Sequence, residues 1–367
     1  MIPLFKHYPL LSEKLPYVAL GGFPTPVQKL ERLGRDIGVN NLYIKCDDRS
    51  GKLYGGNKVR KFEFILGHAL KSGIKEVLTF GNAGAKHALS TAVAAQQVGL
   101  KSICMMMPEP QVPYARSNLL MTYYCGAELQ HQRSKQLLIL ATAYQLFRHK
   151  LKCGRFPQFI PGRGSSPLGT IGFVNAAFEL REQIMAGEMP EPDCIYVVKG
   201  SGGTAVGLML GIKAANLKSR VVCVRAVDAK TAEPREMARL YNETASLLHS
   251  LDPSFPRLEC SDREIDIRRG FFGRGYGCAT EEGLKAMSLL EKAEGIKLDT
   301  IYTAKAFACL LDDVGKGELR DRVVLFWNTY NSRDFSGAIA DVDYHCLPRS
   351  FHRYFEGYGQ TSGQACT

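Results

Sequence analysis

The alternation of short apolar runs with helical patterns is the feature of this sequence that most restricts its fold. Apolar stretches typical of buried strands are Leu42–Cys46, Glu76–Phe80, Ser102–Met106, Cys194–Val198, Val221–Val227 and Val323–Trp327. Between them, Arg60–Lys71 has apolar residues at helical spacing, and His87–Val98 is rich in alanine. Strands that alternate with helices form parallel sheets covered on both faces, which predicts an α/β fold. Ligands are then expected at the carboxyl ends of strands, in the loops after Phe80, Val198 and Ile301.

A run of small residues follows one of the expected strands, in Val198-Lys-Gly-Ser-Gly-Gly-Thr-Ala-Val-Gly-Leu208. Its glycines let backbone N–H groups converge on an anion, and Ser201 and Thr204 add hydroxyl donors where a helix begins. The run lacks the Lys-Ser/Thr ending of a nucleotide P-loop and the acidic residue of a dinucleotide fold. It therefore indicates a site for a single phosphate group, with a tight turn that binds nothing as the alternative.

Lys58 ends the segment Gly55-Gly-Asn-Lys58, where a glycine-rich loop meets the apolar helix expected at Arg60–Lys71. A lysine at such a junction can be shielded from water, which lowers its pKa and makes the amine a usable nucleophile. A solvated lysine in a turn is the alternative, and this segment alone does not exclude it.

Composition and charge narrow the function classes. The chain has 367 residues and a formal charge of +11, which suits two domains and a small anionic ligand. Its basic residues are interspersed with acidic ones and accompany no nucleic-acid-binding motif, so we expect no nucleic-acid partner. The histidines show no metal-ligand spacing, so we expect no metal. Eleven cysteines without a C-x-x-C pair, no signal peptide and no transmembrane run predict reduced thiols, a cytoplasmic location and no membrane contact.

Several blocks of the chain match one known family in the same order. They are Pro24-Thr-Pro26, Leu42-Tyr-Ile-Lys-Cys-Asp-Asp48, Gly55-Gly-Asn-Lys-Val-Arg-Lys-Phe-Glu63, Ile160-Pro-Gly-Arg-Gly-Ser-Ser-Pro-Leu-Gly169, Gly200–Thr204, Gly273-Arg-Gly-Tyr-Gly277 and Glu294-Gly-Ile-Lys-Leu-Asp-Thr-Ile-Tyr-Thr-Ala-Lys-Ala306. Over residues 20 to 330 the chain resembles the 1-aminocyclopropane-1-carboxylate deaminase and D-cysteine desulfhydrase family. These proteins belong to the tryptophan-synthase-like, fold type II pyridoxal-phosphate enzymes.

The resemblance implies a two-domain fold in which each domain is an open, mostly parallel sheet flanked by helices. A large cofactor-binding domain would comprise residues 1–59 and 171–345, and a small α/β domain, residues 60–170, would be inserted in it. Pyridoxal 5'-phosphate is the implied cofactor, a small amino acid the implied substrate, and a homodimer the implied assembly. A C-terminal tail, residues 346–367, would either be loosely held or pack on the partner subunit.

The resemblance also assigns residues to the cofactor. Lys58 matches the lysine that binds the cofactor as an imine and later moves the α-proton. The phosphate loop matches Gly200, Ser201, Gly202, Gly203 and Thr204, and Asn82 is a candidate partner for the phenolic oxygen. Thr303 matches the residue that faces the pyridine nitrogen, which is glutamate in the deaminases and threonine in the desulfhydrases. Because a hydroxyl does not hold the pyridinium proton as a carboxylate does, the ring tends to stay neutral, which suits elimination.

On the substrate side the chain both keeps and departs from the family pattern. Tyr276 and Tyr302 match the two tyrosines that face the substrate, with buried core aromatics as the alternative. The substrate loop reads Gly81-Asn-Ala-Gly-Ala-Lys-His87, so the family's serine is Ala85 and its asparagine is Lys86. A methyl group neither donates nor accepts a proton, which closes a serine-dependent route. The residues still expected to bind substrate are Ala85, Lys86, His87 and Ser165.

Two of these residues have a plainer interpretation, since Lys86 can be a solvated surface lysine and His87 a packed histidine. The resulting prediction is a pyridoxal-phosphate-dependent lyase or deaminase that removes the α-proton of a small amino acid and eliminates to a 2-oxo acid and ammonia. The alternative is a cofactor-binding homologue whose lyase activity is lost or altered, because the family's serine is Ala85. A nucleotide-dependent enzyme that uses the glycine-rich run is a third possibility.

Overall fold

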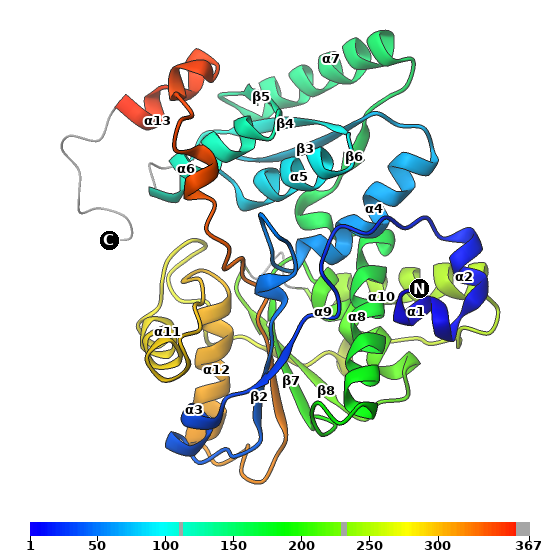
Figure 1. The fold of residues 1–367 in the computed structure, drawn as a ribbon, viewed down its shortest axis with the longest axis vertical. Helices are drawn as coiled ribbons and strands as arrows, with labels where there is room; N and C mark the ends of the chain where they lie inside the picture. Colours follow the sequence, from blue (N-terminus) through cyan, green and yellow to red (C-terminus); the bar gives the residue numbers. More distant parts are fainter. Residues whose placement is uncertain (110–112, 229–232, 357–367) are drawn as a thin grey trace.

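A computed structural model describes residues 1–109, 113–228 and 233–356, and these residues form two sheets flanked by helices (Figure 1). The larger sheet is parallel except at β1, which pairs antiparallel with β2. In spatial order its strands are β1 (Val27–Lys29), β2 (Leu42–Lys45), β10 (Val324–Trp327), β7 (Cys194–Lys199), β8 (Arg220–Arg225) and β9 (Ile267–Arg268).

Helices cover both faces of this larger sheet because successive strand residues point to opposite sides. Ile195 and Val197 pack on one side and Tyr196 and Val198 on the other. The first face is covered by α1 (Pro3–His7), α2 (Pro9–Lys14), α8 (Pro167–Met185), α9 (Gly203–Ala214) and α10 (Pro234–Leu251). The second is covered by α3 (Glu31–Asp36), α11 (Glu281–Glu294) and α12 (Thr303–Gly315).

The smaller sheet is entirely parallel, and its strands lie in the order β5 (Glu128–His131), β4 (Lys101–Met107), β3 (Glu76–Asn82) and β6 (Gln158–Ile160). One face packs on α4 (Lys58–Lys71), α5 (Lys86–Gln97) and α6 (Pro113–Tyr124). The other face packs on α7 (Lys135–Cys153). The prediction of an α/β, fold type II architecture is confirmed, whereas the residue boundaries of the two domains stay a prediction.

The six expected strands are all present, with ends that shift by one or two residues. The run expected to reach Val227 ends at Arg225, and the strand expected at Ser102–Met106 extends to Lys101–Met107. Four strands had no clear apolar signal, since β1, β5, β6 and β9 are two to four residues long and none is fully buried. Short strands at or near a sheet edge owe their conformation to pairing rather than to their own composition.

The chain after β10 returns to the smaller sheet through η5 (Ser336–Ile339), η6 (Tyr344–Cys346), η7 (Arg349–Phe351) and α13 (Arg353–Glu356). Phe351 and Tyr354 are buried there, and Arg116 of α6 donates its Nε–H to the Tyr354 carbonyl oxygen at 2.8 Å. The first part of the expected tail therefore packs on its own chain, so the prediction of a loosely held tail is wrong for residues 346–356. Packing on a partner subunit stays a prediction. The remainder of that tail lies outside the described residues.

The cysteines follow the prediction at most positions. Nine described cysteines are free thiols, and seven of these are buried. Cys278 is disulfide-bonded, so the prediction that all the cysteines are reduced is wrong at that position. None of the helices formed by the described residues combines the length and the apolar character needed to span a membrane.

Candidate active site

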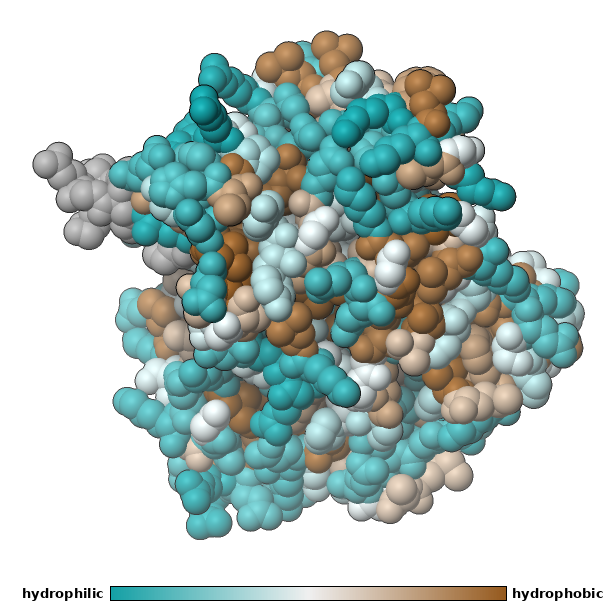
Figure 2. Space-filling model, turned by 45° about the horizontal axis from the view of Figure 1, so that its top comes forward, coloured by the Kyte–Doolittle hydropathy of each residue, from teal (hydrophilic) through white to brown (hydrophobic). Residues whose placement is uncertain are grey.

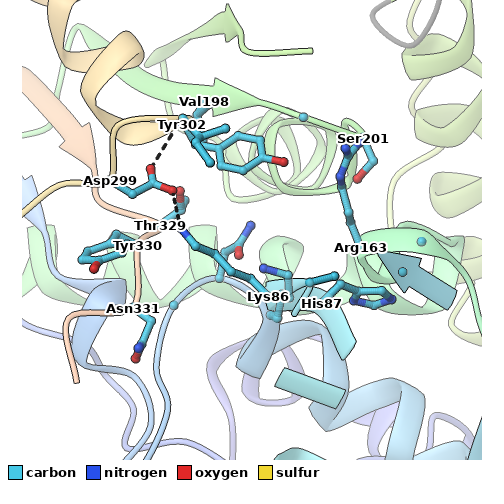
Figure 3. A pocket seen from close by; sticks show the side chains of 18 of the residues that line it. Lys86, His87, Arg163, Val198, Ser201, Asp299, Tyr302, Thr329, Tyr330 and Asn331 are labelled. Carbon is cyan, nitrogen blue, oxygen red and sulfur yellow. Dashed lines mark hydrogen bonds and ion pairs between the residues drawn. The ribbon is translucent and has the colours of Figure 1, made fainter. Parts of the chain in front are cut away.

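A cavity of about 370 Å³ lies where the two sheets face each other. The loops that follow β3 and β7, the loop before α12 and the first turns of α4 and α5 all contribute to its wall. The loops after β3 and β7 follow strand ends at which the sequence predicts ligand binding. The third predicted loop, after Ile301, lines the cavity but follows no strand. Figure 3 shows side chains around this space, most of them from loops and helix starts, such as Lys86 of α5 and Tyr302 before α12.

Lys58 is the first residue of α4 and lines the cavity. Burial lowers the pKa of its ammonium group to about 8, and the positive charges of Lys86 and Arg163 add to this shift. A substantial fraction of the amine is therefore neutral near pH 8, as a nucleophile or a proton acceptor requires.

Two residues further along α4, a buried ion-pair network fixes the start of the helix. Arg60 lies 2.7 Å from an oxygen of Asp47 and 2.8 Å from an oxygen of Glu179, and all three side chains are at most 2% exposed. Glu179 also pairs with buried Lys45 at 2.6 Å. The Asp47 carboxylate accepts the indole N–H of Trp327 at 2.8 Å, which ties α4 to β10. Lys58 is thus carried on a rigid part of the fold.

The glycine-rich run forms the turn between β7 and α9, as the sequence predicts. Gly202 has a φ of +95°, a conformation that favours glycine. A Cβ atom at Gly203 would lie 2.7 Å from Ser165 Oγ and 3.1 Å from Lys61 Nζ, so any other residue there would displace these two side chains. Because the first N–H groups of a helix lack partners within it, the start of α9 offers donors to an anion.

Hydroxyl groups and one amide surround this turn. Ser165 Oγ lies 2.7 Å from Ser201 Oγ and accepts the Gly203 N–H at 3.3 Å. Asn57 donates its side-chain amide to Thr204 Oγ1 at 3.0 Å, which links the turn to the residue before Lys58. Ser165, expected on the substrate side, therefore lies at the turn that the sequence predicts to bind a phosphate group.

Lys61 also reaches the turn, and the sequence reasoning did not single it out. Its Nζ lies 3.4 Å from Ser165 Oγ and 3.3 Å from the Arg163 carbonyl oxygen, and the side chain is buried. Burial, together with the charges of Lys58 and Arg163, lowers its pKa to about 7. The available signal was its spacing, because residues i and i+3 share one helix face and Lys61 is three residues after Lys58.

Thr303 begins α12, and Asp299 caps that helix. One carboxylate oxygen of Asp299 accepts the Tyr302 N–H at 3.1 Å, the Thr303 N–H at 2.8 Å and the Thr303 hydroxyl at 3.0 Å. The other oxygen lies 2.8 Å from the Nζ of Lys86, which extends from the start of α5 (Figure 3). Burial alone would raise the pKa of Asp299, but the Lys86 ammonium lowers it below the usual value. Lys86 is therefore not a solvated surface lysine.

The predicted substrate loop forms the first turn of α5 and the residues before it. Ala85 lines the cavity and occupies the N-cap position without a side-chain hydrogen bond. His87 is buried, its Nε2 lies 2.9 Å from Thr79 Oγ1, and its ring stacks on Phe62. Burial, with the nearby Lys58 charge, lowers its pKa to about 3, so the imidazole is neutral and suits the packed interpretation. Asn82, at the end of β3, also lines the cavity.

The two predicted tyrosines, Tyr276 and Tyr302, both line the cavity, and their hydroxyl oxygens lie 2.7 Å apart. Tyr276 is 47% exposed, so it is not a core aromatic. Arg163 holds its guanidinium 5.6 Å from the centre of the Tyr276 ring. Arg163 has a φ of +63°, a conformation that costs a non-glycine residue about 1 kcal/mol. That cost is consistent with a side chain held in place for binding.

Most of the chain matches one family of known proteins. Residues 18–329 match the family described as pyridoxal-phosphate dependent enzyme. A putative 1-aminocyclopropane-1-carboxylate deaminase of Pyrococcus horikoshii is 34% identical over 315 residues, which cover 86% of this chain and 91% of the relative. A D-cysteine desulfhydrase of Serratia proteamaculans is 30% identical over 349 residues, which cover 91% of this chain and 98% of the relative.

Solved structures agree with the sequence relatives. The crystal structure of an ACC deaminase homologue superposes with a TM-score of 0.74 at 33% identity, covering 90% of this chain and 95% of that one. A processed threonine deaminase from Solanum lycopersicum, at 14% identity and a TM-score of 0.57, shares the fold. The chain therefore belongs to the pyridoxal-phosphate dependent enzyme family.

Proposed function

We propose that this protein is a pyridoxal-phosphate lyase that removes the α-proton of a small amino acid and eliminates to a 2-oxo acid and ammonia. The observation that carries the proposal is the position of Lys58, whose pKa is lowered to about 8, in the same cavity as the glycine turn at the start of α9. Relatives named as deaminase and desulfhydrase, at 30% identity or more, support this reaction class.

The groups around the cavity suit the cofactor. Lys58 would hold it as an imine, while the turn from Gly200 to Thr204, with Lys61 beneath it, would hold the phosphate. Backbone N–H groups, hydroxyls and a buried ammonium are the donors that a phosphate monoester prefers. Asn82 would face the phenolic oxygen and Thr303 the ring nitrogen. When bound, the cofactor supplies an electron sink for the charge left by proton removal.

Proton transfer falls to Lys58 and the tyrosine pair. A neutral Lys58 amine would accept the α-proton. Burial raises the pKa of Tyr302, and the hydrogen bond with Tyr276 adds to this rise against the opposing charge of Arg163. Tyr302 therefore stays protonated at neutral pH and can donate to a leaving group or a carbon.

Arg163 is the cation best placed for a substrate carboxylate. Lys86 is already paired with Asp299 across the cavity. Within residues 1–109, 113–228 and 233–356, Arg163 forms no ion pair, although it lines the cavity beside Tyr276. A guanidinium binds a carboxylate through two parallel hydrogen bonds. The predicted substrate loop, with Ala85, Lys86 and His87, would then shape the pocket opposite.

A second candidate function rests on Ala85, which presents a methyl group to the cavity where the family carries serine. A protein that binds cofactor and amino acid without turnover would keep Lys58 and lose the serine hydroxyl. The two functions differ in products and not in cofactor binding.

The deciding experiment supplies the holoenzyme with D-cysteine, L-cysteine or 1-aminocyclopropane-1-carboxylate and measures ammonia, 2-oxo acid and sulfide. Equal release of ammonia and 2-oxo acid, abolished in Lys58→Ala, is the result expected of a lyase. A cofactor-loaded protein that releases no ammonia from any small amino acid would leave the binding protein as the correct function.

A further inference from the structure

The acidic and basic side chains around the cavity do not balance. Hydrophilic residues are spread over the whole face of the molecule drawn in Figure 2 and indicate no particular ligand there. In the lining of the cavity, basic residues outnumber acidic ones, and the described members of this set are Lys58, Lys61, Lys86, Arg163, Asp299 and Glu109. Lys86 is paired with Asp299, and Lys61 lies at the glycine turn. With Lys58 assigned to the imine, Arg163 is the cation of this set that remains for the substrate.

The Arg163 side chain extends from the glycine turn to the tyrosine pair. A Cβ atom at Gly200 would lie 4.0 Å from Arg163 Cδ and 3.7 Å from Tyr302 Cε1, so both side chains flank the first residue of the turn. The guanidinium lies 5.6 Å from the centre of the Tyr276 ring. Burial would lower its pKa, but Tyr302 and Tyr276 raise the pKa above the usual value, so Arg163 stays charged. A cation and two hydroxyl groups therefore lie together on one side of the cavity.

The backbone at Arg163 is in the left-handed region, with a φ of +63°. Glycine adopts this conformation freely, whereas an arginine pays about 1 kcal/mol for it. Among the residues that the structure describes, no carboxylate forms an ion pair with Arg163 that would offset this cost. An anionic ligand would supply the missing counter-charge.

A second position for an anion lies at the start of α5. The first N–H groups of a helix lack partners within it, and Ala85, the N-cap residue, offers them no side-chain acceptor. Ala85, Lys86 and His87 all line the cavity. An amino acid with a single carboxylate fills only one of the two positions, at α5 or at Arg163. A substrate that carries a second negative group fills both.

We propose that the substrate is a small amino acid whose β-carbon carries an anionic leaving group, a sulfonate or a phosphate ester. The inference rests on the proposed lyase function, because it names the substrate class of the same site. The α-carboxylate then lies at the start of α5, and the anionic β-substituent lies at Arg163 beside the tyrosine hydroxyls. A guanidinium binds two oxygens of such a group through parallel hydrogen bonds.

The reaction balances without an oxidant or a reductant. Lys58 takes the α-proton as the Cα–H bond breaks. The Cβ–S or Cβ–O bond breaks with both electrons on the leaving group, which departs as sulfite or phosphate. The remaining 2-aminoacrylate tautomerises to a 2-imino acid, which water hydrolyses to pyruvate and ammonia. Because the leaving group gains negative charge, a fixed cation beside it stabilises the transition state more than the bound substrate.

The substrate class is tested by ammonia release from the holoenzyme with both enantiomers of cysteate, O-phosphoserine, serine and cysteine. Cysteate or O-phosphoserine should have a kcat/KM about 100-fold above that of serine, because two charge-assisted hydrogen bonds are added. Sulfite or phosphate, released in an amount equal to ammonia, identifies which of the two groups leaves.

Variants of Arg163 connect this preference to the guanidinium. Arg163→Gly should fold, because glycine accepts the left-handed backbone. It should lose the preference for an anionic leaving group while cysteine turnover changes less than about 3-fold, since cysteine has no anionic group to pair. Arg163→Lys keeps the charge and should keep part of the preference. The matched control is Arg239→Gln, which removes an exposed cation of α10 and should leave the preference unchanged.

Binding gives a readout that does not depend on turnover. Aspartate carries a carboxylate where cysteate carries its sulfonate, but this group does not leave, and asparagine is its neutral counterpart. Followed by the change in cofactor absorbance, one enantiomer of aspartate should bind about 10-fold more tightly than the corresponding asparagine. In Arg163→Gly the two should bind equally.

The outcomes separate this inference from the lyase function. Ammonia release from cysteine without any preference for an anionic group overturns the inference and leaves the lyase function intact. If no amino acid yields ammonia, the lyase function is refuted, and equal binding of aspartate and asparagine then overturns the inference as well. Loss of cofactor from Arg163→Gly would place Arg163 on the cofactor phosphate, which also overturns it.

Discussion

Lys86 and Asp299 form an ion pair across the cavity, with 2.8 Å between Nζ and Oδ2, and so connect the start of α5 to the start of α12. Asp299 also accepts the backbone N–H and the hydroxyl of Thr303, the residue expected at the pyridine nitrogen. Lys86, at a position where the family resemblance implies asparagine, is therefore part of the frame that holds Thr303 at the start of α12.

Replacing Lys86 with methionine should lower the free energy of unfolding by about 1–2 kcal/mol, because a buried carboxylate loses its counter-charge. This loss of stability is small for a broken ion pair of a buried carboxylate, because the Lys86 side chain is 30% exposed and water screens its charge. Urea unfolding followed by circular dichroism measures the change. Lys285→Met removes an exposed pair with Glu281 and should leave stability unchanged. Equal effects of the two substitutions would show that the Lys86 pair has no special role.

Ala85→Ser should stabilise the protein and raise lyase turnover. Ala85 has the extended backbone of an N-cap residue but no side-chain acceptor, and serine at such a position contributes about 1 kcal/mol. The new hydroxyl would also restore a proton-transfer group, an effect worth about 100-fold or more in rate. Thermal unfolding and ammonia release from D-cysteine measure the two effects. Ala85→Val adds bulk without a hydroxyl, so identical behaviour of Ser and Val would refute the explanation.

Ionised Glu179 should stabilise the fold, and this contribution to the free energy of unfolding should be lost in acid. Burial would raise its pKa, but Arg60 and Lys45 lower it to about 2. Because this folded value lies below the unfolded value of about 4.5, the stabilisation is complete above pH 4.5. It is lost as the pH falls toward 2.

Glu179→Gln should therefore cost about 3 kcal/mol at pH 7, and the difference from wild type should shrink between pH 4.5 and pH 2. Urea unfolding at several pH values tests this. Glu182→Gln, which removes an exposed pair with Lys6, serves as the control and should leave the acid profile as it is. A Glu179→Gln deficit that stays constant down to pH 2 would contradict the assigned pKa.

The sequence was sufficient for features that are encoded locally. Strands such as Cys194–Lys199 are continuous apolar runs. The turn after β7 is a run of small residues rich in glycine, a composition that is typical of a tight turn at the start of a helix. The positions of Lys58, Thr303 and the tyrosine pair came from the family resemblance, and all of them line one cavity.

Other features depend on residues far apart in the chain. The pairing of Lys86 with Asp299 spans 213 positions, and the contact of Lys61 with Ser165 spans 104. A periodic sequence pattern indicates local structure and carries no information on contacts between distant positions. Lys86 could therefore not be distinguished from a solvated lysine, and Lys61 was missed. The packing of Tyr354 on α6 was hidden for the same reason.

The central claim is that Lys58, and not its neighbour Lys61, carries the cofactor. Lys61 is a fair competitor because its pKa, lowered to about 7, also leaves the amine partly neutral. Borohydride reduction of the pyridoxal-phosphate-loaded protein converts the imine to a stable secondary amine, and peptide mass spectrometry then locates it. The label should be on Lys58, should form with a half-maximal rate near pH 8, and should vanish together with the visible absorbance in Lys58→Ala. A label on Lys61, or one that persists in Lys58→Ala, would contradict the account.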